Sequence, residues 1–249
     1  MSFTLTENWD STTAPAVPGT WNADSQIVTS TTRFRSSPNG LTLGSGTANT
    51  KYYATYSVAD TGHGATLDLT QYVYVDTLSV PGNYNIGPTF RCSAATMDNS
   101  STTCYWFYLN YLLPSGAQQL HFAKIVNGTV TNLYTVFCGT GEITTGQWFA
   151  IRVVCSGSNT FNVTFTRASD GWTMDQFGVF GASSSVAVVN FVNSDVASGD
   201  YYGVCAAGAA TNSRLYMDDA WVNASGGTVI LTPRRPHVVP IPFRYYRPD

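Results

Sequence analysis

Apolar and polar side chains alternate with a period of two residues along most of this chain. The pattern is clear in Gln147–Cys155 and again in Thr160–Phe165. Successive side chains of a β-strand point to opposite faces, so this period predicts strands, whereas the spacing of an amphipathic helix is almost absent. The alternation therefore predicts an all-β protein.

The strands are expected to be short and joined by turns. Asn127-Gly128 lies between apolar runs and predicts a two-residue hairpin, because both residues tolerate positive φ. The expected strands are Thr4–Trp9, Gln26–Thr31, Leu41–Leu43, Tyr52–Ser57, Ala65–Val75, Ile86–Cys92, Thr103–Leu112, Gln119–Val126, Thr129–Phe137, Trp148–Cys155, Thr160–Arg167, Val186–Val192, Tyr201–Ala206 and Arg214–Val222. About fourteen strands imply two stacked antiparallel sheets of six or seven strands each. Neither a central linker nor an internal repeat is evident, so one domain is expected.

Charge and hydropathy exclude several classes of partner. Charged residues are 11% of the 249 residues and the net charge is -3, which gives no electrostatic basis for binding nucleic acid or an anionic membrane. No run of about 18 apolar residues is present, so no membrane-spanning segment is expected.

The N-terminus and the cysteines bear on where the chain is made. Residues 1–7 lack the basic and apolar regions of a secretion signal, which favours synthesis in the host cytoplasm. The five cysteines, all in apolar strand-like runs, are expected to be buried thiols, with a Cys92–Cys104 bridge as the main alternative.

The last segment, residues 226–249, differs from the rest. It holds five of the eleven prolines, which favour an extended arm outside the sandwich formed by residues 1–225. Alternating arginines and aromatic rings suit a protein surface better than water, so we expect the arm to dock on a neighbouring subunit or on the sandwich itself. The docking residues are expected to be Arg234, Arg235, Phe243, Arg244, Tyr245, Tyr246 and Arg247.

Several motifs in their order resemble the concanavalin A-like and laminin-G-like lectin jelly rolls. Gly146-Gln147-Trp148 opens a strand as "G-x-W" does in that family, and Gly199–Val204 and Leu215–Val222 resemble its closing strands. Glu7-Asn8-Trp9-Asp10 resembles the opening strand, so the resemblance spans about residues 3–224. It implies a two-sheet β-sandwich of the kind found in lectins, glycoside hydrolases, adhesion modules and bacteriophage virion proteins, and fold alone does not choose among these.

Acidic residues argue against catalysis. Glycoside hydrolysis uses a pair of carboxyl groups, and the glucanases of this fold carry two glutamates on one strand. Here Glu7 and Glu142 are the only glutamates and lie far apart in the sequence, with no E-x-D-x-x-E pattern. We therefore expect a protein that is not an enzyme, and a polysaccharide-degrading enzyme using aspartates is the weakest alternative.

Asp218-Asp219 is the most prominent acidic pair. Neighbouring strand residues face opposite ways, so the two are not expected to act together. We expect one to bind backbone N–H groups and the other to be solvated; a structural calcium ion held by Asp218 or Asp219 is the alternative. The three histidines are far apart in the sequence, which makes zinc improbable.

Aromatic residues are 14% of the chain and raise the question of a sugar platform. In Tyr105–Tyr111, Trp106, Tyr108 and Asn110 share one face of the expected strand. The candidate glycan contacts are Trp106, Tyr108, Tyr201 and Tyr202, and the alternative is that these rings belong to the core.

Taken together, these features favour a non-enzymatic binding protein of a bacteriophage virion, either a capsid decoration protein or an accessory tail protein. Its partners would be other virion proteins, including copies of itself, and a cell-surface glycan. A carbohydrate-binding lectin module for host attachment is the alternative. No cofactor is expected apart from the calcium ion considered above.

Overall fold

The computed structural model describes most of the chain up to Ser225. The described residues are 2–7, 21–23, 26–36, 39–43, 50–57, 66–76, 82–94, 100–113, 118–156, 159–182, 189–196, 199, 201–208 and 215–225. The expected arm, residues 226–249, lies outside them, so its docking stays a prediction.

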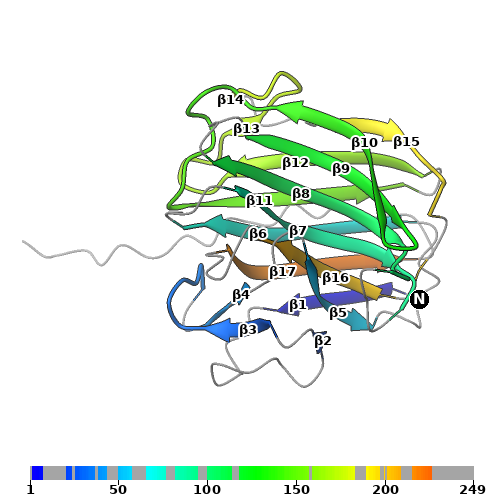
Figure 1. Ribbon diagram of the computed structural model, residues 1–249. Coiled ribbons are helices and arrows are strands. Elements are labelled where there is room, and N and C mark those ends of the chain that lie inside the picture. The colour runs from blue at the N-terminus through cyan, green and yellow to red at the C-terminus, as the bar shows by residue number, and fades with distance from the viewer. Residues whose placement is uncertain are drawn as a thin grey trace, which may run out of the picture.

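All described elements are strands, and they form two stacked antiparallel sheets (Figure 1). The first sheet has seven described strands, in the order β10 (Thr129–Phe137), β9 (Gln119–Val126), β8 (Cys104–Leu113), β7 (Gly82–Cys92), β16 (Tyr201–Ala207), β5 (Lys51–Ser57) and β2 (Trp21–Ala23). The predicted two-sheet sandwich of lectin-like type is confirmed.

The second sheet has ten described strands. Eight run in the order β14 (Phe180–Gly181), β13 (Thr173–Met174), β12 (Thr160–Arg167), β11 (Gln147–Cys155), β6 (Thr66–Val75), β17 (Leu215–Ser225), β4 (Gly40–Leu43) and β3 (Ile27–Ser30). In addition β1 (Ser2–Glu7) pairs with β17, and β15 (Val189–Val192) pairs with β12. This sheet is larger than the predicted six or seven strands because β13 and β14 were not expected and β1 and β15 join outside the main order.

The predicted hairpin at Asn127-Gly128 is confirmed. The two residues have φ values of 47° and 75°, and the strands on either side pair from Val126 with Thr129 onward. Positive φ at both central positions is what this turn requires, so the sequence cue acts through the backbone itself.

The core lies between the sheets and is rich in aromatic rings. Along β8, Tyr105, Phe107 and Leu109 point inward and are fully buried. Rings from both sheets meet there: Tyr105 and Phe161 have centroids 5.1 Å apart. Burying each such side chain contributes about 1.5–3 kcal/mol, so this layer is the main force that holds the sheets together.

A second, smaller cluster lies on the outer face of the seven-stranded sheet. It contains Trp106 and Tyr108 from β8, Cys92 from β7 and Cys205 from β16. The predicted division of β8 into two faces is therefore confirmed, and both faces bury apolar side chains. None of the five cysteines is in a disulfide; Cys92, Cys104, Cys155 and Cys205 are buried as expected, whereas Cys138 is half-buried.

Three register shifts interrupt the described ladders; one lies in the β9–β10 pair between Asn132 and Tyr134, and the other two are β-bulges with a positive φ at a non-glycine residue. In β7 the register against β16 shifts by one residue beside Arg91, which has a φ of 53°. In β17 the register against β6 shifts between Asp218 and Trp221, and Asp219 has a φ of 48°. A bulge re-aims the side chains beside it, and both bulges matter below.

Among the described residues, no helix has the length and apolar character that crossing a bilayer requires.

Candidate functional site: the outer face of the seven-stranded sheet

Three amide side chains lie side by side on the outer face of the seven-stranded sheet. Asn85 of β7 is opposite Asn110 of β8, and Asn110 is opposite Gln119 of β9. On β10 the next position is Phe137, whose ring is 67% exposed. We call Asn85, Asn110, Gln119 and Phe137 the amide row.

The amide row keeps unused hydrogen-bonding capacity. The three amide side chains are half-buried, and the Oδ1 atoms of Asn85 and Asn110 are buried from solvent and have no hydrogen-bond partner, so a ligand reaches them only when the amide groups turn outward. The Oε1 atom of Gln119 is hydrogen-bonded to the Nε2 atom of His121 at 2.8 Å. Each amide group both donates and accepts, so the row suits a ligand whose groups also do both, such as hydroxyl groups.

Next to the amide row, aromatic rings stack on each other. The rings of Trp106 and Tyr108 have centroids 4.0 Å apart, and those of Tyr108 and His121 are 4.9 Å apart. Burial lowers the pKa of His121 to about 4 and raises the pKa of Tyr108 to about 12. This stack is a rigid support for the amide row.

Three of the four predicted glycan contacts are not accessible. Trp106 is 2% exposed and Tyr108 is 6% exposed, so neither ring presents a face to a ligand. Tyr202 points between the sheets, where its hydroxyl donates to Gln71 Oε1 at 2.7 Å. These three predictions are corrected because the rings serve packing. Tyr201 is half-buried on the outer face, so its assignment stays a prediction.

The exposed aromatic rings are others, which the sequence reasoning did not single out. Phe137 and Phe177 are 67% and 74% exposed, and Trp172 is 41% exposed. Phe137 and Phe177 are held near each other by a backbone hydrogen bond. The N–H of Gly139, just after β10, donates to the carbonyl oxygen of Gly178 in the β13–β14 turn at 2.9 Å. The sequence signal for an exposed ring was weak, because Phe137 only continues the period-two alternation of its strand.

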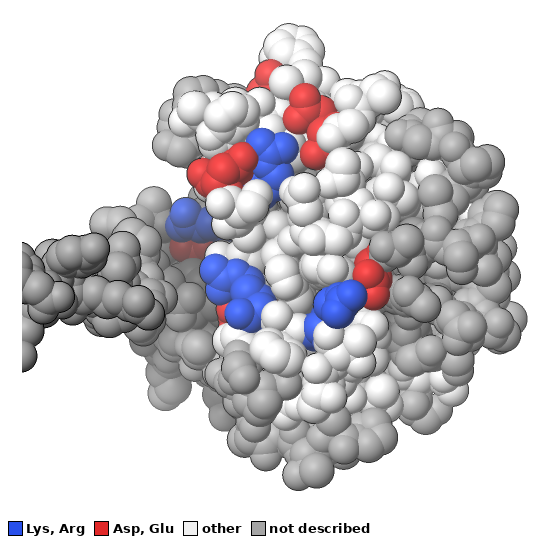
Figure 2. Space-filling view, turned by 90° about the vertical axis from the view of Figure 1, so that its left-hand side faces the viewer, with Lys and Arg blue, Asp and Glu red and all other residues white. Residues whose placement is uncertain are grey.

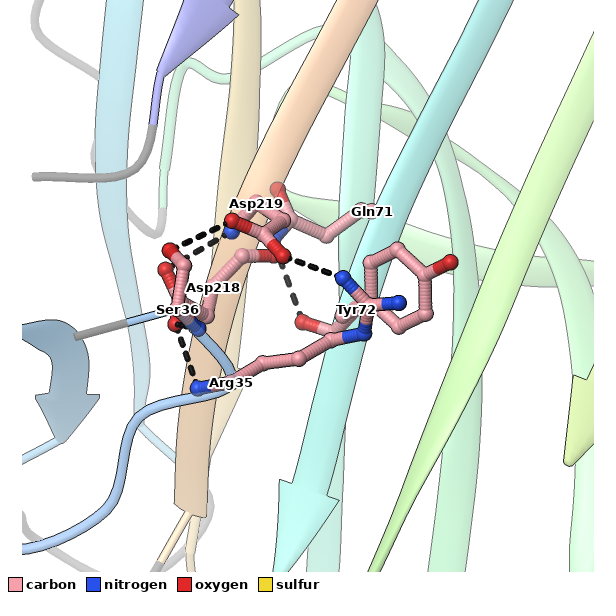
Figure 3. A network of polar contacts seen from close by, with 6 residues as sticks. All are labelled: Arg35, Ser36, Gln71, Tyr72, Asp218 and Asp219. Atoms are coloured by element: carbon pink, nitrogen blue, oxygen red, sulfur yellow. Dashed lines mark hydrogen bonds and ion pairs between the residues drawn. The ribbon is translucent and has the colours of Figure 1, made fainter. Parts of the chain in front are cut away.

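Asp218 and Asp219 form a polar network with the segment that precedes β4 (Figure 3). Asp218 Oδ2 accepts the backbone N–H groups of Arg35 and Ser36 at 2.6 and 2.9 Å. Asp219 accepts the Ser36 hydroxyl at 2.7 Å and pairs with the Arg35 guanidinium at 2.5 Å. The guanidinium also lies 3.7 Å from the centroid of the Tyr72 ring.

The prediction that the two aspartates face opposite ways is wrong. The bulge with positive φ at Asp219 turns its carboxylate toward the same segment that Asp218 binds. The expectation that one aspartate binds backbone N–H groups is confirmed for Asp218, whereas Asp219 is ion-paired and not simply solvated. Burial raises the pKa of Asp218 to about 7.

The oxygens of this pair are already engaged. Both Asp218 oxygens accept backbone N–H groups, and a cation at Asp219 would have to displace the Arg35 guanidinium. Within the described ranges, no group of three or more His, Cys, Asp or Glu side chains is arranged to hold a metal ion. Calcium binding finds no support in these contacts and stays a prediction.

Charged side chains form small mixed groups. Figure 2 shows Lys and Arg next to Asp and Glu, with wide uncharged areas between them. The ion pairs include Arg152–Asp68 at 2.8 Å and Lys124–Asp195 at 2.7 Å. The mixed charges on the face shown in Figure 2 favour an uncharged ligand over a polyanion.

Comparison with known proteins identifies the fold and no family. No family model matches the chain, and no curated protein matches it in sequence. Among solved structures, the CBM2 module of the evolved Dit of Lactobacillus casei BL23 phage J-1 is similar with a TM-score of 0.57 and 9% identity, covering 92% of this chain and 99% of that one.

Two lectin-type domains are similar at the same level of sequence identity. The exoplasmic/lumenal domain of VIP36, in a Ca2+/Man2-bound form, has a TM-score of 0.50 and 10% identity, over 92% of this chain and 90% of that one. The legume lectin-like domain from Entamoeba histolytica has a TM-score of 0.50 and 8% identity, over 84% and 91%. At these identities the likeness shows the lectin-like fold.

Proposed function

We propose that this protein is a non-catalytic carbohydrate-binding domain that contacts its glycan through the amide row. The observation that carries the proposal is the alignment of the half-buried Asn85, Asn110 and Gln119 on three neighbouring strands, with the exposed Phe137 ring beside them. Neighbouring strands are about 4.8 Å apart, comparable to the length of one sugar unit, so successive amides would meet successive units of a chain.

The chemistry of the row favours a neutral glycan. Amide groups bind the vicinal hydroxyls of a sugar, and an exposed ring stacks on its apolar face. No charged side chain belongs to the row, so a sugar carrying carboxylate or phosphate groups would have no partner there. The similar structures, a phage CBM2 module and the exoplasmic/lumenal domain of VIP36 in a Ca2+/Man2-bound form, support a glycan as the ligand.

The acidic side chains support a binding role over a hydrolytic one. Hydrolysis needs two carboxyl groups that face a substrate. Eight of the described carboxylates instead bind cations or backbone N–H groups of the protein itself, namely Asp68, Asp76, Glu142, Asp170, Asp175, Asp195, Asp218 and Asp219.

The test is binding of neutral oligosaccharides, first on a glycan array and then by calorimetry. We expect Asn85→Ala, Asn110→Ala and Phe137→Ala each to weaken binding about tenfold, the effect of losing one good contact. Asn190→Ala and Phe34→Ala are the matched controls, because these residues are exposed and lie on the ten-stranded sheet and on the segment before β4. The proposal fails if no glycan binds, or if the controls weaken binding as much as the amide-row variants.

We further propose that the domain belongs to a bacteriophage particle, to which residues 226–249 attach it. The arginines and aromatic rings of this segment support attachment to another virion protein, as does the likeness in fold to a phage Dit module. Deleting residues 226–249 should leave glycan binding unchanged and abolish incorporation into particles. Incorporation of the truncated protein at the wild-type level would refute the role of the arm without affecting the glycan proposal.

A further inference from the structure

Three thiols gather in the outer cluster of the seven-stranded sheet, away from the amide row. Cys92 ends β7, Cys104 begins β8, and Cys205 lies in β16; each is 0% exposed. All three are free. None takes part in the proposed glycan site, so their grouping needs a separate explanation.

The bulge in β7 decides which two thiols face each other. Phe90 lies opposite Tyr105, so without a bulge Cys92 would lie opposite Thr103. The extra residue at Arg91 shifts the register by one, and the N–H of Ser93 donates to Thr103 O at 3.0 Å. Ser93 therefore lies opposite Thr103, and Cys92, one residue earlier, lies opposite Cys104. Both cysteine side chains are on the outer face of the sheet.

This placement suits a disulfide. Opposed residues of an antiparallel pair have Cα atoms about 4.5–5.5 Å apart, which lies within the range of about 4.4–6.8 Å that disulfides span. The Cys104 thiol is in hydrogen-bond contact with Cys92, a contact that, after burial, helps to raise the pKa of Cys104. The two sulfur atoms are therefore already neighbours.

Cys205 is placed differently. It pairs with Gly87 of β7 and Tyr53 of β5, whereas Cys92 pairs with Tyr201. Four residues along a strand correspond to about 13 Å, which is too far for a bridge from Cys205 to Cys92 without backbone movement.

We propose that Cys92 and Cys104 are a redox-active pair that forms a cross-strand disulfide when the protein meets an oxidising environment. Both thiols are 0% exposed, so the reaction with oxidised glutathione requires a local opening of the strand ends. One protein thiolate then attacks the glutathione disulfide, forms a mixed disulfide and releases one reduced glutathione. The second protein thiolate attacks the mixed disulfide and releases another. Two thiols lose two electrons and two protons in all, and the two glutathione molecules that leave carry them.

The folded protein is the right material for the test, because an unfolded chain would pair its cysteines without preference. The protein is equilibrated with oxidised glutathione, quenched with acid, unfolded and alkylated, and then digested with trypsin. Cleavage after Arg91 and Lys124 places Cys92 and Cys104 in one peptide that holds no other cysteine. We expect that peptide to escape alkylation and to weigh two hydrogens less than its reduced form.

Matched variants separate the pair from its neighbour. Cys205→Ser should bridge like the wild type, and Cys92→Ser should leave Cys104 open to alkylation. The bridged protein should also unfold about 5–10 °C higher than the reduced one, and a reductant should reverse the shift. Alkylation of both cysteines at equilibrium, or a bridge that includes Cys205, would overturn the proposal.

Discussion

Asp218 and His121 are buried ionisable side chains in opposite sheets, and burial moves their pKa values in opposite directions. The pKa of Asp218 is raised to about 7, and that of His121 is lowered to about 4. In the unfolded chain the two groups titrate near 3.8 and 6.5. Each shift corresponds to a free energy on the order of 3 kcal/mol.

The two shifts have opposite effects on stability as pH changes. Asp218 stabilises the fold fully below about pH 4 and loses that contribution as pH rises through 7, because its folded pKa is raised. His121 stabilises the fold fully above about pH 6.5 and loses its contribution as pH falls through 4, because its folded pKa is lowered. Between pH 4 and 6.5 the two slopes largely cancel.

Replacing either residue should therefore reveal the pH dependence of stability that the other one contributes. The free energy of unfolding of Asp218→Asn should rise from pH 4.5 to 6.5, and that of His121→Gln should fall from pH 4.5 to 7.5, each by on the order of 1–3 kcal/mol. Urea titrations followed by tryptophan fluorescence measure both. Two flat profiles, or slopes with the signs exchanged, would contradict these pKa shifts.

At two positions the period-two alternation of the sequence gives the wrong side-chain direction. Period two places Asp218 and Asp219 on opposite faces, and one residue with positive φ cancels that inference. Nothing in the local sequence predicts the bulge, because its partners Arg35 and Ser36 are about 180 positions away. The same holds for Cys92, which faces Cys104 only because of the bulge at Arg91.

At the scale of elements, the short hairpin of β13 and β14 depends on close backbone packing. Gly178 in its turn has a φ of 81°, and a Cβ there would lie 2.1 Å from the carbonyl oxygen of Phe137. Gly141 has nearly the same φ, 82°, and a Cβ there would meet nothing within 4 Å. The two glycines differ only in the space around them.

This pair separates backbone strain from steric conflict. Gly141→Ala should cost about 1 kcal/mol, the price of a left-handed conformation for a residue with a Cβ. Gly178→Ala should cost at least about 2 kcal/mol more, because β10 or the turn must move. Thermal unfolding of both variants checks the difference. Equal losses would mean that the turn yields without resistance and that the contact with Phe137 is not tight.

Elements with strong local signals were predictable, and elements held by packing were not. The hairpin at Asn127-Gly128 follows from two residues that accept positive φ. Strands β13 and β14 have two residues each, too few to show alternation, and they exist because β12 pairs with one of them through Thr166 and Thr173. The same limit applies to β2, which has three residues.

For the whole molecule, the sandwich was predictable because strands such as β11 and β12 show their buried face through alternation. The candidate site was not. Trp106 and Tyr108 attract attention as large rings, yet they lie 2% and 6% exposed. The amide row becomes visible only when three strands are aligned, since Asn85, Asn110 and Gln119 are separated in the sequence and meet through register.

One hydrogen-bonded chain crosses the core and joins the two sheets. Tyr202 of β16 donates to Gln71 Oε1 at 2.7 Å, and Gln71 Nε2 of β6 donates to the carbonyl oxygen of Asp218 at 2.8 Å. Burial raises the pKa of Tyr202, so the hydroxyl stays protonated and remains a donor. The chain links the seven-stranded sheet to the bulge that binds Arg35 and Ser36.

Tyr202 and Gln71, the two side chains of this hydrogen-bonded series, should be coupled in their contribution to the free energy of unfolding. Tyr202→Phe leaves Gln71 Oε1 buried without its donor, so we expect a loss of about 1–3 kcal/mol. Adding Gln71→Leu to Tyr202→Phe should cost less than the sum of the single changes, because no buried acceptor on Gln71 is then left unpaired. Urea unfolding of the wild type, both single variants and the double variant gives the coupling energy. Strict additivity would show that the two sheets are held by apolar packing alone and that the polar crossing does not contribute to their alignment.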